Sequence, residues 1–132
     1  MTSSRTNFAR SGGTLPQVIS TDTAEHYQWG GPNADQADGW FLVKQPGLHV
    51  IEELLPPDTT EARHLHKVAR QLFYVLAGEL TMEVDGETFT VPVGKGIEIT
   101  PGLPHQAANH GPADLRILVI SQPPSHGDRF PA

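Results

Sequence analysis

Regular punctuation by turn residues is the feature that most restricts the fold of this chain. Between residues 40 and 121, short apolar, β-prone runs are separated by Gly, Pro and Asp-Gly signals. The runs recur at roughly the 8–12-residue spacing that is typical of β-sandwiches and β-barrels. No window maintains the 3.6-residue apolar period of a long helix. We therefore predict an all-β fold.

The individual runs predict the strand positions. Strands are expected over residues 15–20, 40–45, 48–55, 62–66, 71–77, 79–84, 87–93, 96–100, 105–110 and 114–121. Asp85-Gly86 is the strongest short hairpin signal in the chain. Residues 23–39 contain several breakers and are predicted to be mostly loop. Residues 1–14 are expected to form a flexible N-terminal arm, followed by a single domain over residues 15–132.

Composition limits the ligands and partners. The 132 residues have a net charge of −6, and the 9 Lys and Arg residues are scattered, so neither nucleic acid nor an anionic membrane surface is expected as a partner. The chain has no cysteine, which excludes disulfides, thiolate metal ligands and a cysteine nucleophile. Any metal must therefore be bound by histidine, carboxylate or amide groups. The N-terminal residues lack the apolar core of a signal peptide, and we expect a cytoplasmic protein.

Two histidines, one residue apart, indicate a metal site. On a strand, alternate side chains face the same way, so His64 and His66 point to one face. Gln71 reaches that face only if the polar segment 67–70 makes a turn or bulge. His105 follows the tight turn TPGLP and begins a new strand. Three imidazoles and an amide from two distant segments make a plausible site for one divalent ion.

These residues resemble the two motifs of the cupin family. The first motif, G-x5-H-x-H-x(3,4)-E-x6-G, is reproduced from His64 to Gly78, with Gln71 in place of its glutamate and Asp58 in place of its leading glycine. The second motif, G-x5-P-x-G-x2-H-x3-N, is reproduced from Gly94 to Asn109. Threonine replaces its proline, at residue 100.

The resemblance implies a small jelly-roll barrel with a metal near one mouth, held by His64, His66, Gln71 and His105. It also implies a small-molecule substrate, and because homodimers are common in the family we expect one here. The glutamine makes the site similar to that of the zinc-dependent aromatic polyketide cyclases, in which three histidines and one glutamine hold the ion. In an alternative arrangement, Gln71 points away from the metal and leaves a three-histidine site.

The neutral glutamine bears on the chemistry. An ion bound by four uncharged ligands keeps its full positive charge, which strengthens it as a Lewis acid and disfavours a trivalent state. Zinc is the expected metal, and iron, nickel, cobalt or manganese are alternatives. Lewis-acid chemistry such as polyketide cyclisation or isomerisation is the first functional hypothesis. An Fe- or Ni-dependent dioxygenase and a non-enzymatic small-molecule binding or sensing module are the other two.

Lewis-acid chemistry of this kind also needs an acid–base partner. Glu53 and His49 are the candidate catalytic residues, because they share an alternating face of the strand before the first motif. In the opposite register, Glu52 would face the barrel instead. His126 is a weaker candidate and is expected to be solvated.

Overall fold

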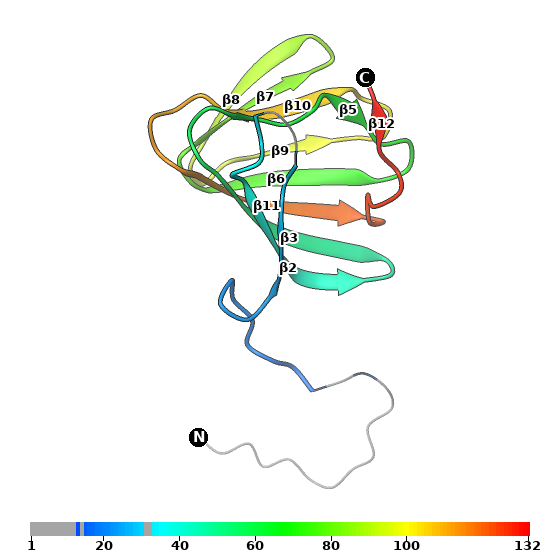
Figure 1. Cartoon of the computed structure of the whole chain (residues 1–132). Coiled ribbons are helices and arrows are strands. Elements are labelled where there is room, and N and C mark those ends of the chain that lie inside the picture. The colour runs from blue at the N-terminus through cyan, green and yellow to red at the C-terminus, as the bar shows by residue number, and fades with distance from the viewer. Residues whose placement is uncertain (1–12, 14, 31–32) are drawn as a thin grey trace, which may run out of the picture.

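A computed structural model describes residues 13, 15–30 and 33–132, which form two sheets packed face to face (Figure 1). The first sheet has the order β1 (Glu25–Gln28), β2 (Asp38–Gln45), β3 (Leu48–Leu55), β11 (Leu115–Gln122), β6 (Arg70–Ala77) and β9 (Gly96–Ile99). The second has the order β12 (Phe130–Pro131), β5 (His64–Leu65), β10 (His105–Asn109), β7 (Glu79–Val84) and β8 (Glu87–Pro92), and β4 (Thr59–Thr60) also pairs with β10. The prediction of an all-β double-sheet fold is confirmed.

Strand β6 shows why these sequences form half-buried strands. Gln71, Phe73 and Val75 are buried and alternate with the exposed side chains of Leu72 and Tyr74. This period of two places one face against the core and the other against solvent.

The predicted hairpin turn is confirmed by the backbone. Asp85 has a φ of 50° and Gly86 a φ of 91°, between the paired strands β7 and β8. Two positive φ values in succession are the signature of a type I′ turn, whose twist matches that of the flanking strands. The turn sets the register that pairs Val84 with Glu87.

The N-terminal third departs most from the prediction. Residues 15–20 form no strand; they are exposed and run away from the sheets (Figure 1). Residues 23–39, predicted to be mostly loop, contain β1 and the start of β2. The arm predicted over residues 1–14 lies outside the described residues except for Gly13. Propensity alone did not reveal β1, because its polar residues pair along the edge of β2 and bury little.

The core fills the space between the sheets. Its fully buried large apolar side chains are those of Leu55, Val75, Leu80, Met82, Leu115 and Ile117. Both sheets contribute to this group, as expected for a double-sheet sandwich. Within the described part of the chain, no helix has the length and apolar character needed to cross a membrane.

Candidate metal centre

Strand pairing brings the three predicted histidines together. His64 on β5 lies directly opposite His105 on β10 in an antiparallel pair, although the two are far apart in sequence. Their ring centroids are 4.4 Å apart, and that of His66 is 4.9 Å from His64. The candidate ligand atoms of the three residues all lie within 4.8 Å of one another, and all three side chains are buried. The predicted convergence of these residues is confirmed.

A tight turn ties the two histidine-bearing segments to each other. Pro101 and Gly102 follow the end of β9, and Gly102 has a φ of 88°, a conformation that a glycine adopts without steric cost. The N–H of Gly102 donates to the carbonyl oxygen of His66 at 2.7 Å. The turn therefore places His105 at the start of β10. Its hydrogen bond also fixes the backbone at His66.

Hydrogen bonds orient all three imidazoles in the same way. The Nδ1–H of His64 donates to the carbonyl oxygen of Ala62 at 2.7 Å, and that of His105 to Leu103 at 3.0 Å. His66 Nδ1 is bound by the carbonyl oxygen of Asp128. Because a carbonyl oxygen can only accept, each bond places the proton on Nδ1 and leaves a free lone pair on Nε2. This is the usual tautomer of a metal-binding histidine.

The free ends of these side chains form a set of unsatisfied polar atoms. Among the described residues, His66 Nε2, His105 Nε2 and Gln71 Oε1 are buried without a hydrogen-bond partner. Leaving one such atom unpaired costs about 1–3 kcal/mol, so three in one cluster call for a ligand. All three are lone-pair donors, and a divalent cation satisfies all of them together. The residues present therefore fit a metal ion.

The amide of Gln71 is positioned by the neighbouring strand. Its Nε2 donates to the hydroxyl of Ser121 on β11 at 2.9 Å, and both side chains are buried. The bend over residues 67–68 lets Gln71 share the cavity that His64 and His66 also line. Ser121 was not identified from the sequence, because a serine at the end of an apolar strand carries no motif signal.

The electrostatics favour neutral imidazoles. Burial, with smaller effects from the charge of Arg129 and the neighbouring histidines, lowers the pKa of His64 to about 3, although its hydrogen bond to Ala62 opposes the shift. Burial also lowers the pKa of His105 below its usual value. The unprotonated form is the one that binds metal, so these two side chains are ready to act as ligands at neutral pH.

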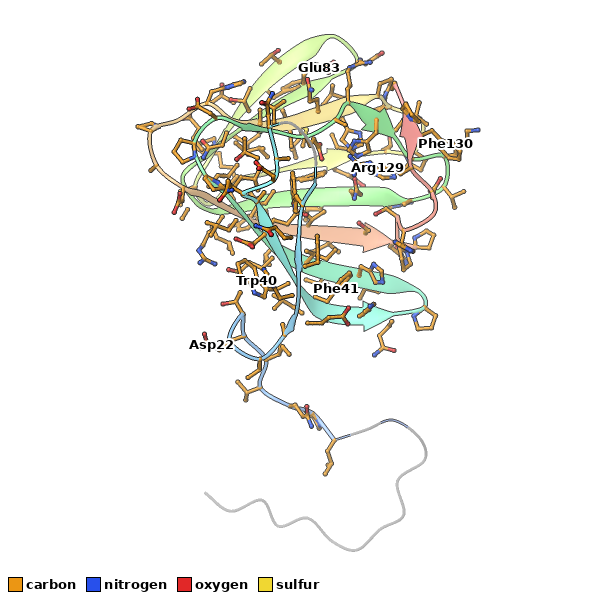
Figure 2. The ribbon with its side chains drawn as sticks, viewed as in Figure 1. Asp22, Trp40, Phe41, Glu83, Arg129 and Phe130 are labelled. Atoms are coloured by element: carbon orange, nitrogen blue, oxygen red, sulfur yellow. The ribbon has the colours of Figure 1, made fainter. Side chains whose placement is uncertain are left out.

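The candidate site opens into a cavity of about 980 Å³. Apolar parts of its wall come from Phe41, Ile51, Phe73 and Val119. Figure 2 shows Arg129 on the C-terminal segment and Phe41 on β2, and both residues line this cavity. The C-terminal segment contributes Pro124, Ser125, His126, Gly127 and Arg129 to the wall of the same cavity.

The structure resolves the register of the two glutamates. Glu53 is buried and lines the cavity together with His49. Glu52 points to the opposite face of the sheet, where it accepts a hydrogen bond from Arg116 at 2.6 Å. His126, which was expected to be solvated, is exposed and lies at the cavity wall.

Glu53 has two neighbours that the sequence did not reveal. The hydroxyl of Tyr27 donates to Glu53 Oε2 at 3.1 Å, and the second buried acid, Glu61, lines the same cavity. Burial, followed by the charge of Glu61, raises the pKa of Glu53 to about 8. Burial raises the pKa of Glu61 to about 7. Tyr27 lies in the segment predicted to be loop, and Glu61 occupies an unspecified position of the first motif, between Asp58 and His64, so neither carried a signal.

Asp128 on the C-terminal segment holds the loop after His66. Its carboxylate accepts the N–H groups of Lys67, Val68 and Ala69 at 2.9, 3.0 and 2.9 Å, and these bonds lower its pKa. Its carbonyl oxygen binds His66. One residue thus fixes both the ligand ring and the chain that leads from it to Gln71. The sequence did not indicate this role for Asp128, because the residue is remote from both motifs.

Comparison with known families gives an independent assignment. The sequence model described as "Cupin domain" matches residues 51–121, which is more than half of the chain. An uncharacterized protein of Methanocaldococcus jannaschii is 37% identical over 80 residues, covering 60% of this chain and 64% of that protein. Polyketide synthase CurC of Streptomyces cyaneus is 27% identical over 70 residues, covering 53% of this chain and 46% of the relative. The chain thus spans less than two thirds of either curated relative.

Solved structures show the same fold. The polyketide cyclase RemF from Streptomyces resistomycificus superposes with a TM-score of 0.74 at 20% identity, covering 89% of this chain and 86% of that one. A predicted oxalate decarboxylase from Thermotoga maritima also has a TM-score of 0.74, at 17% identity, covering 82% of this chain and all of that one (100%). At these identities the likeness establishes the architecture and leaves the activity open.

Proposed function

The chain belongs to the cupin domain family, and from this premise we propose that it is a metal-dependent enzyme acting on an oxygen-rich small molecule. The proposed reaction is non-redox, such as the cyclisation of a polyketide or an isomerisation. The observation that carries the proposal is the cluster of buried, unpaired donor atoms on His66, Gln71 and His105, which the Nε2 of His64 completes. All four donors are uncharged.

The proposed ligands are His64, His66, Gln71 and His105. A divalent ion bound by them, with zinc as the first candidate, would act as a Lewis acid that polarises a substrate oxygen. Gln71 offers an amide oxygen where a glutamate would have neutralised part of the charge. This supports Lewis-acid chemistry over redox cycling.

Glu53 is the proposed acid–base group. Its carboxyl borders the cavity that His64, His66 and Gln71 line, so it can exchange a proton with a substrate bound there. Burial raises its pKa to about 8, so the ionised and protonated forms are both accessible near neutral pH, which suits a group that must accept and donate a proton. The hydroxyl of Tyr27 holds the carboxyl in place through Oε2.

The rest of the cavity suits a carbon skeleton bearing oxygens. Phe41, Ile51, Phe73 and Val119 provide apolar contact and exclude water from the reacting atoms. His49 borders the same space and is a second proton carrier, because burial lowers its pKa and keeps it neutral at pH 7. The similarity to polyketide synthase CurC and to the polyketide cyclase RemF supports polyketide-like compounds as the first substrates to test.

We propose that the protein acts as a homodimer. Leu72, Tyr74 and Leu76 form an exposed apolar row on the outer face of β6, with exposed fractions of 37%, 38% and 40%. Leu118 and Ile120 of β11 pair with Tyr74 and Leu72 and extend this row. A second copy covering the row would remove it from water.

Metal content together with oxygen uptake tests the proposed chemistry. Protein purified without chelators is expected to contain zinc, or another divalent metal, at about one ion per chain. Cyclisation or isomerisation of β-polyketone substrates should proceed without oxygen consumption. His64→Ala should lose both metal and turnover while it stays folded by circular dichroism.

Two outcomes would contradict the proposal. Stoichiometric oxygen consumption with diketone or flavonoid substrates would assign a dioxygenase instead. Tight binding of a small molecule without turnover, in metal-loaded protein, would assign a binding module.

A further inference from the structure

A second cavity, of about 300 Å³, adjoins the one that contains the candidate metal ligands. Four residues border both cavities: Tyr27, Glu53, Glu61 and Arg129. The candidate ligands border the larger cavity only or neither. The smaller cavity is completed on its far side by Trp29, Gly30, Ala34 and Ala62. Glu53 and Glu61 therefore belong to the walls of both the candidate reaction cavity and the smaller cavity beside it.

The two acids in this wall are buried. Glu53 is 9% exposed and Glu61 is 8% exposed. Glu53 Oε2 accepts the hydroxyl of Tyr27, and Glu61 Oε2 accepts the backbone N–H of Ala107 at 2.8 Å. Neither acid takes part in any of the ion pairs found among residues 13, 15–30 and 33–132.

The charge of Arg129 lowers the pKa of both acids, but burial outweighs this effect and leaves both pKa values raised. Arg129 has an exposed side chain whose Nη2 donates to the carbonyl oxygen of Ala62 at 3.4 Å. His49 and His126 border the larger cavity, and Lys44 at its rim pairs with Glu25 at 2.9 Å. His64 and His66 carry the candidate ligand atoms. Glu53 and Glu61 line the same two cavities, and the charge of Glu61 raises the pKa of Glu53, so one of the two buried carboxyl groups retains a proton.

We propose that Glu53 and Glu61 form one proton-sharing pair, with Glu53 serving the larger cavity and the smaller cavity supplying the water that exchanges the proton. Only the role of the pair in turnover rests on the proposed function, because the shared proton is a property of the substrate-free protein.

The proton transfers balance without any other reactant. When Glu53 takes a proton from a substrate carbon, the pair goes from one proton to two, and the extra proton passes to water in the smaller cavity. When a substrate oxygen needs a proton, the pair gives up its proton and recovers one from the same water. No oxidant or reductant is consumed. Through Glu61, Glu53 would thus regain its starting protonation state while substrate fills the larger cavity.

Infrared titration of the carboxyl C=O band in the substrate-free protein tests the pair. At pH 7 the wild-type protein is expected to show about one protonated carboxyl per chain. Glu61→Gln should lower the midpoint of the Glu53 titration by about one pH unit or more, because the repulsion between the two groups disappears. Glu53→Gln should lower the midpoint of Glu61 in the same way. Glu52→Gln is the matched control: Glu52 bonds to Arg116 on the outer face, and its loss should leave the buried band unchanged.

The role of the smaller cavity has its own test. Ala34 is 4% exposed and borders that cavity. Ala34→Leu should displace water from it and raise the midpoint of the carboxyl band, because both acids lose hydration. Val119→Leu, which fills part of the larger cavity instead, is expected to shift the midpoint less.

Three results would overturn the inference. Full ionisation of both acids at pH 6 would exclude a shared proton. If the titration midpoint of each acid were unchanged when the other acid is replaced by glutamine, the two acids would titrate independently. An unchanged midpoint in a folded Ala34→Leu variant would remove the smaller cavity from the mechanism. All three are measured without substrate, so they stand apart from any failure to find an enzymatic activity. Loading with Zn²⁺ should lower the midpoints through its charge and preserve the coupling.

Discussion

Gln71 and Ser121 lie directly opposite each other on β6 and β11, and the amide of Gln71 donates its Nε2–H to the serine hydroxyl at 2.9 Å. This bond decides which end of the amide remains free. Oε1 is left buried and, within the described residues, without a hydrogen bond, so its lone pairs are available to a cation. The hydroxyl of Ser121, near the end of β11, therefore orients the amide of Gln71 so that its oxygen can bind a metal ion.

Removing the serine hydroxyl should weaken metal binding. In Ser121→Ala the amide of Gln71 loses its anchor and can rotate, so we expect the metal dissociation constant to rise by about tenfold. Competition with a chromogenic chelator measures this. Ser125→Ala is the control, because Ser125 borders the same cavity without bonding to Gln71. Equal affinities in all three proteins would show that the bond does not position a ligand.

Exchanging the amide for a carboxylate should tighten metal binding. Gln71→Glu adds a negative charge to an otherwise neutral ligand set, and the new carboxylate can still accept a hydrogen bond from Ser121. The affinity should rise and the rate of any Lewis-acid reaction should fall. Isothermal titration with Zn²⁺ measures the affinity. An unchanged affinity would indicate that position 71 is not a ligand and that the site consists of three histidines.

The carboxylate of Asp128 should matter for metal affinity from outside the site. Asp128→Ala frees the N–H groups of residues 67–69 and loosens the carbonyl that holds His66. We expect metal affinity to fall by about tenfold and amide hydrogen exchange to rise at residues 67–69. Asp128→Asn, which keeps one acceptor oxygen, should recover part of the loss. Asp22→Ala, on the exposed N-terminal segment in Figure 2, should change neither quantity.

The buried acids should give the free energy of unfolding a distinct pH dependence. The pKa of Glu53 is raised from 4.5 to about 8 on folding, so the native state binds its proton more tightly than the unfolded state does. The stability contributed by that proton is complete below about pH 4.5 and is lost as pH rises through about 8. Urea unfolding of metal-free Glu53→Gln should therefore show a smaller loss between pH 5 and pH 8, by on the order of 1–3 kcal/mol.

The comparison with wild type isolates this effect from the histidines. His64 titrates in the opposite sense, because its pKa is lowered from 6.5 to about 3 and its contribution is lost as pH falls. That contribution is common to both proteins and cancels in the difference. Parallel pH profiles for wild type and Glu53→Gln would show that Glu53 is ionised in the folded protein throughout.

A charge on the outer face of β6 should disrupt the proposed dimer. Leu72→Lys places an ammonium group within the apolar row, and burying it at an interface without a partner is unfavourable. Light scattering coupled to size exclusion should then show a monomer in place of the wild-type dimer. Val93→Lys is the control, because Val93 is 57% exposed and lies outside that row. A monomeric wild-type protein would contradict the dimer proposal directly.

Local sequence signals were sufficient for most of the strands and for the identity of the histidine cluster. β3 and β7 begin and end at the predicted residues, because each run is bounded by turn residues that cannot continue a strand. His64, His66 and His105 could be named because their spacing matches two family motifs. The strand predicted over residues 15–20 was wrong, because local β propensity cannot supply a partner strand.

The sequence by itself determined the strand alternation, the turn positions and the set of candidate ligands, since all of these depend on residues close together in the chain. Only the tertiary structure decided that Glu53 faces the cavity and Glu52 does not, that Ser121 orients Gln71, and that Tyr27 and Glu61 adjoin Glu53. These relationships join segments separated by many residues, and the pairing register of the sheets sets them. A local turn fixes the register of a hairpin, but the register between strands that are distant in sequence depends on how all the strands pack, so no single stretch of sequence encodes these contacts.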